Sequence, residues 1–158
     1  HDPRFACSPR GEANAIAIAD ATTSWAFYGH LKTGQADVYA FTLRSPATVP
    51  WNLLVDERDA GNLARPAATL SSPVGKIVAG TDFGRQETFY EPFSRERYAS
   101  TRVRTLRLAA GTYRIVVTME GGSAEQRYTL AVGSAERFGI ADVPYVLGAI
   151  HRIRALDY

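Results

Sequence analysis

Alternating hydrophobic and polar positions run along most of the chain and predict β-strands. In residues 37–43 the large side chains of Tyr39, Phe41 and Leu43 fall on one side, which is the two-residue period of a strand. The same alternation recurs in residues 22–31, 49–57, 110–119 and 127–132. We expect the large apolar residues of these runs to form the core: Trp25, Phe27, Trp51, Leu53, Val55, Tyr113, Ile115, Val117, Tyr128, Leu130 and Val132.

Turn-forming residues separate these runs at short intervals. Lys32-Thr33-Gly34-Gln35, Ser72-Pro73 and Gly121-Gly122-Ser123 are examples, each lying between two predicted strands. Short strands with turns every ~8–12 residues are typical of a β-sandwich or β-barrel. Strands that alternate with long helices are not predicted, which argues against a doubly wound α/β fold.

The last part of the chain has a helical period instead. From Asp142 onward the apolar residues recur at three- and four-residue spacing: Val143, Val146, Leu147, Ile150 and Ile153. We predict a short amphipathic C-terminal helix, with Arg152 and Arg154 near its end, where cations complement the helix dipole. Two roles stay open: the helix packs on the sandwich, or Arg152 and Arg154 contact a partner or an anionic surface.

Three strand motifs carry a family resemblance. They are Asp37-x-Tyr39-x-Phe41, then Ala110-Gly111-Thr112-Tyr113, and last Tyr128-x-Leu130. Together they resemble the bacterial pre-peptidase C-terminal domain. The resemblance implies an all-β fold, a jelly-roll-like antiparallel β-sandwich, in a secreted and non-catalytic module that is often attached to an enzyme. Some modules of this family are similar to carbohydrate-binding domains and hold calcium, so the resemblance makes carbohydrate and calcium candidate ligands here.

The chain divides on these grounds into three parts. Residues 1–11 are an N-terminal extension, residues 12–134 form the sandwich, and residues 135–158 are a helical tail. The length of 158 residues suits one ordinary domain. The charge-free run at 143–150 is far shorter than the ~20 apolar residues of a membrane-spanning helix.

Charge and reactive residues narrow the function classes. Eighteen basic and sixteen acidic residues give a net charge of +2, so we predict no nucleic-acid partner. One cysteine, Cys7, and three histidines exclude a disulfide scaffold and a zinc finger. The sequence contains no GxSxG, HExxH, phosphate-binding loop or dinucleotide motif. We therefore predict a protein that is not an enzyme.

Copper and calcium are the candidate metals. A mature N-terminal His1 would offer its amino and ring nitrogens to copper, with His30 as the second histidine and Asp2 as an oxygen ligand. A frayed terminus or a tag remnant explains His1 without metal. Acidic residues near turns could hold calcium through their oxygens, in the clusters Asp56, Glu57 and Asp59, and Asp82 and Glu87.

Aromatic and basic residues supply the candidate binding surfaces. Phe89, Tyr90, Glu91 and Phe93 lie in one predicted loop, where exposed rings could anchor a partner protein. Arg102 and Arg104 follow on a strand, and arginine is favoured at protein interfaces. Aromatic side chains can also stack on sugars, and the candidates for that role are Trp25, Trp51 and Tyr90.

These observations favour an extracytoplasmic binding or accessory subunit that acts through protein contacts. Its surfaces would be the loop at 89–93, the arginine strand at 102–107 and the C-terminal helix, and its partner could belong to a membrane-associated complex. A copper-binding protein built on His1 and His30 is one alternative. A carbohydrate-binding module is the other.

Overall fold

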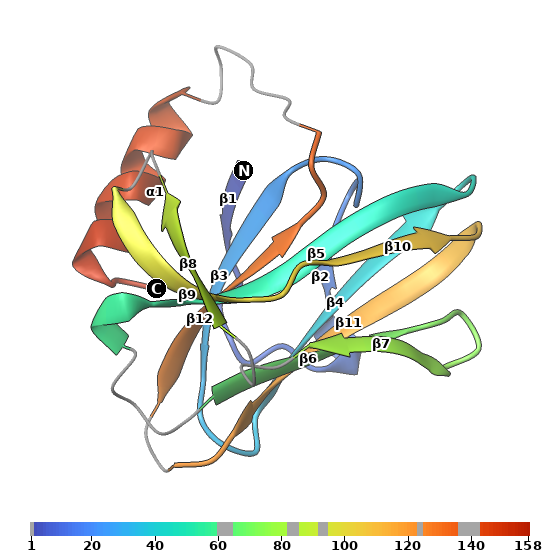
Figure 1. The fold of residues 1–158 in the computed structure, drawn as a ribbon, viewed down its shortest axis with the longest axis horizontal. Helices are drawn as coiled ribbons and strands as arrows, with labels where there is room; N and C mark the ends of the chain where they lie inside the picture. The colour runs from blue at the N-terminus through green and yellow to red at the C-terminus, as the bar shows by residue number, and fades with distance from the viewer. Residues whose placement is uncertain (1, 60–64, 82–85, 92–94, 123–124, 136–142) are drawn as a thin grey trace.

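The computed structural model describes residues 2–59, 65–81, 86–91, 95–122, 125–135 and 143–158 (Figure 1). Two β-sheets form the two layers of a sandwich, with one helix beside them. Sheet A contains β1 (Asp2–Phe5), β3 (Trp25–Leu31), β5 (Ala47–Asp56), β8 (Gln86–Glu91), β9 (Glu96–Thr101), β10 (Arg104–Leu108) and β12 (Gln126–Val132). Sheet B contains β2 (Ile16–Ala17), β4 (Ala36–Leu43), β6 (Arg65–Ser71), β7 (Ile77–Thr81) and β11 (Gly111–Glu120). The helices are η1 (Glu12–Asn14), η2 (Glu57–Asp59) and α1 (Val143–Ala155).

Strand order explains how the chain encloses its core. Sheet A runs β1-β3-β12-β5-β9-β8, with β10 also paired to β5, and sheet B runs β2-β4-β11-β6-β7. Because β3, β4, β5 and β6 alternate between the sheets, successive strands supply both walls of the core. The predicted all-β, jelly-roll-like sandwich with a C-terminal helix is confirmed.

The core consists of the residues that the alternation selects. Tyr39, Leu53, Ile115 and Leu130 are fully buried, and so is Trp51 at 1% exposure. The residues that alternate with the core residues along each strand face outward, as Thr42 and Arg114 of sheet B do. Burying the apolar set contributes roughly 25 cal/mol per Å² of apolar surface, and the two-residue period decides which set that is.

The sheet edges differ from the predicted antiparallel pattern. β1 pairs with β3 in parallel, with Asp2 opposite Trp25, and β2 pairs with β4 in parallel, with Ile16 opposite Tyr39. Residues 2–5 are therefore an edge strand of sheet A, although the sequence placed them in an N-terminal extension. Strands this short carry little periodicity, so the alternation could not reveal them.

A buried carboxylate ties the N-terminal segment to both sheets. Asp37 is fully buried and accepts hydrogen bonds from the Ser8 hydroxyl, the backbone N–H of Arg10 at 2.6 Å and the Tyr128 hydroxyl at 2.6 Å. The Tyr128 and Tyr39 hydroxyls lie 2.7 Å apart. Since three donors converge on the carboxylate, its burial is compensated by hydrogen bonds.

Gly29 makes room for this network, and we predict that Gly29→Ala destabilises the fold. A Cβ at position 29 would lie 2.7 Å from the Tyr128 hydroxyl oxygen and 2.8 Å from the Ser8 hydroxyl oxygen. Overpacking of this kind typically costs ~1–3 kcal/mol of unfolding free energy, measurable by urea denaturation. Gly11→Ala is the control, because its Cβ would meet nothing closer than 3.9 Å. Equal stability of the two variants would contradict the role of Gly29.

Helix α1 packs against the outer face of sheet A. Ile153 is 2% exposed and joins Ala26 and Tyr28 of β3 in a second apolar cluster, with Phe5 and Tyr158 packed against it. The ring centroids of Tyr28 and Tyr158 lie 5.2 Å apart. Burial raises the pKa of Tyr158 well above its usual range. Of the two roles left open, the structure shows the helix packing on the sandwich.

No helix in the described part of the chain has the length and hydropathy to cross a membrane.

Two arginines hold the end of this helix. Arg58 donates to the Arg154 carbonyl at 2.8 Å, and Arg127 donates to the Leu156 carbonyl at 3.5 Å. The guanidinium of Arg58 also binds Asp56 through two bonds of 2.9 and 2.6 Å, and these bonds raise the pKa of Arg58 above its ordinary value. Cations at a helix C-terminus satisfy carbonyls that lack partners within the helix.

Candidate functional site

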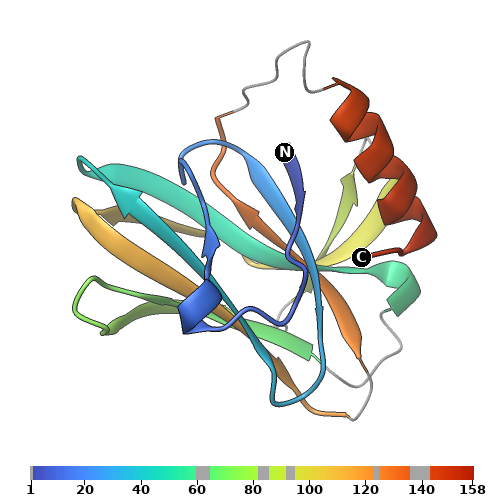
Figure 2. The same ribbon diagram turned by 180° about the vertical axis from the view of Figure 1, so that it is seen from behind.

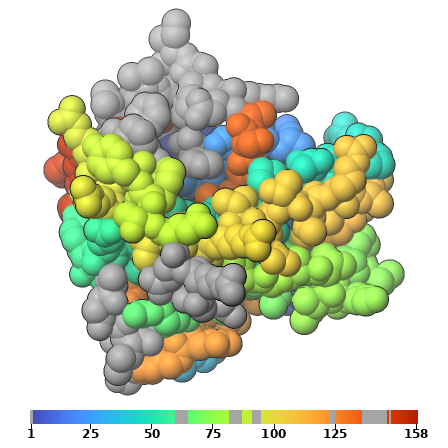
Figure 3. Space-filling view, in the orientation of Figure 1, coloured from blue at the N-terminus to red at the C-terminus, as the bar shows by residue number. Residues whose placement is uncertain are grey.

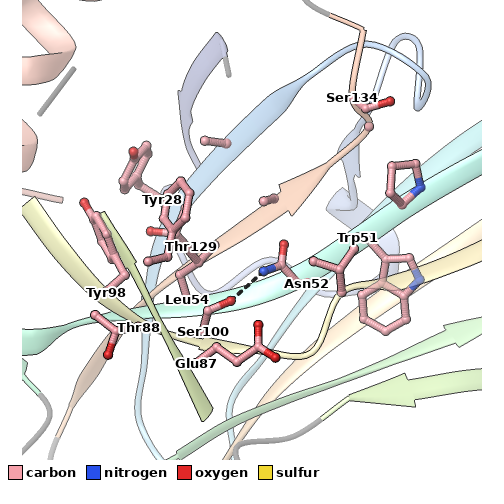
Figure 4. A pocket seen from close by; sticks show the side chains of 16 residues that line it. Tyr28, Trp51, Asn52, Leu54, Glu87, Thr88, Tyr98, Ser100, Thr129 and Ser134 are labelled. Carbon is pink, nitrogen blue, oxygen red and sulfur yellow. Dashed lines mark hydrogen bonds between the residues drawn. The ribbon is translucent and has the colours of Figure 1, made fainter. Parts of the chain in front are cut away.

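A groove of about 350 Å³ lies on the outer face of sheet A (Figure 4). Its floor consists of the outward-facing residues of three adjacent strands, including Asn52 and Leu54 of β5, Thr129 of β12 and Ser100 of β9. In register, Leu54 lies opposite both Thr129 and Ser100, so these side chains share one face. The neighbouring part of the same face is covered by α1, which leaves the groove as its open portion.

Polar groups meet at the floor of this groove. The Asn52 amide nitrogen donates to the Ser100 hydroxyl at 2.8 Å, and that hydroxyl donates to the Thr101 carbonyl at 2.9 Å. The Asn52 side chain is therefore oriented, and its amide oxygen has no bonding partner among the described residues. Thr129 is 4% exposed, and its hydroxyl oxygen has no hydrogen-bond partner in the described structure.

Aromatic rings form the walls. Tyr28 of β3 and Tyr98 of β9 are buried at one end of the groove, and Phe89 of β8 is 39% exposed. Phe89 lies opposite Tyr98 in the β8–β9 pair, so both rings belong to the outer face. A groove that combines aromatic walls with a few convergent polar groups is the usual form of a small-ligand site.

The charge of the lining restricts the chemistry. Glu87 is the one charged side chain among the described residues that line the groove, and it belongs to an exposed part of β8. Arginine, lysine and histidine are absent from that lining, so a phosphate or sulfate would find no cation there. The Ser100 hydroxyl is bonded to an amide and a carbonyl, not to a base that could activate it.

The structure changes the interpretation of the aromatic segment at 89–93. Residues 89–91 were predicted in a loop, and this was wrong, because they end strand β8. Pairing with β9 orders them and places Phe89 at the groove, whereas Tyr90, at 52% exposure, does not line it. Glu91 lies opposite Glu96, and Phe93 lies outside the described residues.

The predicted arginines are not brought to one surface. Arg104 lies opposite the buried Trp51, which places it on the inner side of sheet A and half-buried, while Arg102 is exposed before β10 begins. Arg152 lies over the Phe5 ring, 3.9 Å from its centroid, and donates to the Asp157 carbonyl. Arg154 is exposed on α1. Arg152 thus contributes to helix packing, and none of the four lines the groove.

Among the described residues, His30 of the copper hypothesis has one acidic neighbour, Glu125, and the predicted ligand Asp2 lies far from it. The His30 ring nitrogen lies 3.3 Å from a Glu125 oxygen. Asp2 pairs with Trp25, five residues before His30 on β3 and hence ~16 Å away, and its carboxylate binds Arg4. His1 lies outside the described residues, so its copper site stays a prediction.

The acidic clusters are occupied in part by arginines. Asp56 binds Arg58, and Asp59 binds Arg127 through bonds of 2.9 and 2.8 Å. Asp82 lies outside the described residues. The described part of the chain holds no group of three or more His, Cys, Asp or Glu side chains placed for a metal.

Sequence reasoning missed the polar residues of the groove floor. Asn52, Ser100 and Thr129 occupy the phase of their strands opposite to the core, which is normally solvated. One sequence feature indicates this site: Leu54 and Ala131 are apolar at positions that face away from the core. Both are only 6% exposed in the structure, so this part of the outer face is covered. Of the predicted sugar-binding tryptophans, Trp51 is a core residue at 1% exposure that also lines the groove, whereas Trp25 packs against the core and does not line the groove.

Comparison with known proteins supports the fold. No model of a known protein family matches the sequence, and no curated protein matches it. The pre-peptidase C-terminal domain of a Bacillus anthracis collagenase matches with a TM-score of 0.50 and 17% identity, covering 79% of this chain and 97% of that one. The resemblance seen in the strand motifs is thus confirmed at the level of the fold.

More distant solved structures also match. PliG, a periplasmic inhibitor of g-type lysozyme from Salmonella Typhimurium, has a TM-score of 0.43 and 17% identity over 75% of this chain and 96% of that one. A family 35 carbohydrate-binding module from an environmental isolate has a TM-score of 0.40 and 18% identity over 65% of this chain and 68% of that one.

Proposed function

We propose that the protein is a non-catalytic, extracytoplasmic binding module whose groove on sheet A holds a small neutral ligand rich in hydroxyl groups, a saccharide. The observation that carries the proposal is the buried Thr129 hydroxyl, which lines the groove without a partner beside the oriented amide of Asn52. An unbonded buried hydroxyl costs ~1–3 kcal/mol, and a ligand hydroxyl would remove that cost.

The lining supports a sugar over other small ligands. Sugar hydroxyls both donate and accept, which suits the Asn52 amide oxygen and the Thr129 hydroxyl. The apolar face of a sugar ring would lie against Phe89 or Tyr98. The volume of about 350 Å³ is at the small end of ligand sites, which favours one or two sugar units over a long chain.

The groove lining supports a non-catalytic role, and the fold supports an extracytoplasmic location. Glu87, the one charged side chain of the described lining, lies opposite Ser100 in the β8–β9 pair, but the Ser100 hydroxyl is bonded to the Asn52 amide and the Thr101 carbonyl and to no base. The fold is that of a domain found in a bacterial collagenase, and the resemblance implies secretion.

We predict that the groove variants Thr129→Val and Asn52→Ala lose saccharide binding. The probe is a glycan array, and the glycans that bind are then titrated by calorimetry. Each variant removes one hydrogen bond to the ligand, and we expect affinity to fall about tenfold or more. Thr105→Val is the matched control, because Thr105 is exposed on β10 and outside the groove. An array without binding, or equal affinity of groove and control variants, would refute the proposal.

A protein partner is the second candidate, and one observation favours it. Tyr90 exposes 52% of its surface at the end of the β8–β9 hairpin and does not line the groove. Exposed aromatic rings on ordered hairpins are common anchors of protein interfaces. If Tyr90→Ala abolished capture of a partner while Thr129→Val did not, the hairpin rather than the groove would be the functional surface.

A further inference from the structure

Three turns meet at the end of the sandwich opposite α1. They connect β4 to β5 (residues 44–46), β6 to β7 (residues 72–76) and β10 to β11 (residues 109–110). Gly111 pairs with Leu43, and a Cβ on Gly111 would lie 2.6 Å from a ring carbon of Pro73, so the turns touch. Figures 1 and 2 both place them together, at the right in the first view and at the left in the second. We call this the basic end, for the residues described next.

The segments that form the basic end are free of acidic residues over long stretches. Residues 38–55, 65–81 and 97–119 contain no aspartate or glutamate, although the chain has sixteen acidic residues. The same segments contain eight basic residues: Arg44, Arg65, Lys76, Arg97, Arg102, Arg104, Arg107 and Arg114. Of these, Arg65 and Arg97 lie near the starts of β6 and β9, away from the three turns, and Arg114 pairs with Glu12 at 2.9 Å. The small net charge of +2 therefore conceals a marked asymmetry.

Three of these side chains lie at the turns themselves. Arg44, Lys76 and Arg107 are exposed, and within the described structure their side chains make no ion pair or hydrogen bond. Arg58 and Arg127, in contrast, are paired with Asp56 and Asp59. The charge at the basic end is thus available to a partner.

Exposed apolar side chains lie next to Lys76 in the β6–β7 turn. Val74 is 89% exposed in the turn between β6 and β7, and Ile77, at the start of β7, is 63% exposed. In Figure 3 the segments around these turns project together at the right of the molecule. Apolar side chains at the tip of a turn, flanked by cations, suit a surface into which they can insert.

We propose that the basic end docks on the surface of an anionic lipid bilayer. Arg44, Lys76 and Arg107 would lie among anionic headgroups, while Val74 and Ile77 would enter the headgroup boundary. Charge complementarity makes this partner anionic. A projecting turn fits a deformable bilayer better than the flat face of ~800 Å² that a stable protein interface needs. This docking does not depend on the ligand of the groove.

The helix predicted for an anionic surface does not compete for this role. Arg152 is bound to the Phe5 ring and the Asp157 carbonyl, and Ile153 is buried against β3. The membrane contact thus moves from the C-terminal helix to the opposite end of the sandwich.

Flotation with lipid vesicles tests the proposal. The chain is mixed at low salt with phosphatidylcholine vesicles, either pure or containing about a third of phosphatidylglycerol, and the bound fraction is measured. We expect binding to the anionic vesicles only, with most of it lost at high salt. Each removed cation is expected to weaken partition about fivefold, so the triple variant R44S/K76S/R107S should bind about a hundredfold more weakly.

Matched variants separate the basic end from total charge and total hydrophobicity. Arg97→Ser removes an exposed cation from β9, and Tyr90→Ser removes an exposed ring from β8, both away from the three turns. We expect Lys76→Ser and Val74→Ser to weaken binding, and these two controls to leave it unchanged. Circular dichroism verifies that each variant is folded.

Several outcomes would overturn the proposal. They are equal binding to pure and anionic vesicles, no binding to either, and equal losses in the basic-end and control variants. Binding to soluble polyglutamate but not to anionic vesicles would also overturn it, because the partner would then be an acidic polymer or protein. Saccharide binding by the groove can succeed or fail in each case, so the two proposals are tested separately.

Discussion

Replacing Asp37 with alanine is expected to destabilise the fold by about 3–5 kcal/mol, a large part of the ~5–15 kcal/mol that a domain of ordinary stability has. The Asp37 carboxylate is fully buried and accepts from Ser8, Arg10 and Tyr128. Alanine would leave these three donors without their acceptor in a site that water does not reach. The free energy of unfolding from urea denaturation measures the loss.

Two further variants identify the cause of that loss. Asp37→Asn keeps the shape and one acceptor oxygen, so it should cost less than alanine. Asp157→Ala removes an exposed carboxylate and should stay within about 0.5 kcal/mol of the original protein. If Asp37→Ala also stayed within that range, the hydrogen bonds to Asp37 would not be what holds the N-terminal segment on the sandwich.

The core could be predicted from the sequence because one rule decides it. A strand buried on one face must place its apolar phase inward, and Tyr39, Ile115 and Leu130 all follow that rule. The helix at the C-terminus could be predicted for the same reason, from its different period. These features depend only on residues near one another in the chain.

The groove and the basic end could not be predicted, because they depend on strand order. Thr129 and Asn52 are 77 positions apart, and they become neighbours only because β12 pairs with β5, with Thr129 opposite Leu54. The segments without acidic residues are visible in the sequence. That their basic side chains share one end of the molecule is seen only in the fold, where distant turns meet at Gly111 and Pro73. Aromatic residues at both ends of the chain, Phe5 and Tyr158, likewise meet only in the fold.

The paired arginines show how the structure divides its charges. Arg58 and Arg127 bind the carboxylates of Asp56 and Asp59 and hold the end of α1, so those acids are neutralised within the fold. The basic end has no such carboxylates nearby in the sequence. A protein with a net charge of +2 can therefore present a strongly basic surface without an excess of basic residues.

Alkaline pH is expected to unfold the protein through three buried tyrosines. Burial raises the pKa of Tyr39, Tyr128 and Tyr158 far above the usual value of about 10. The folded state keeps these phenol protons at a pH where the unfolded chain has lost them. Their contribution to stability is thus complete below about pH 10 and is lost as the pH rises above that value.

The slope of stability against pH measures this effect. Each retained proton contributes ~1.4 kcal/mol per pH unit above about pH 10, so the three tyrosines together give ~4 kcal/mol per pH unit. Tyr39→Phe should reduce that slope by about a third, in urea denaturation repeated at several alkaline pH values. Phe27→Leu is the control, because Phe27 packs on Tyr39 with ring centroids 5.1 Å apart but carries no ionisable group. It should lower the stability at every pH and leave the slope unchanged, and a slope that Tyr39→Phe does not alter would show that the alkaline transition has another origin.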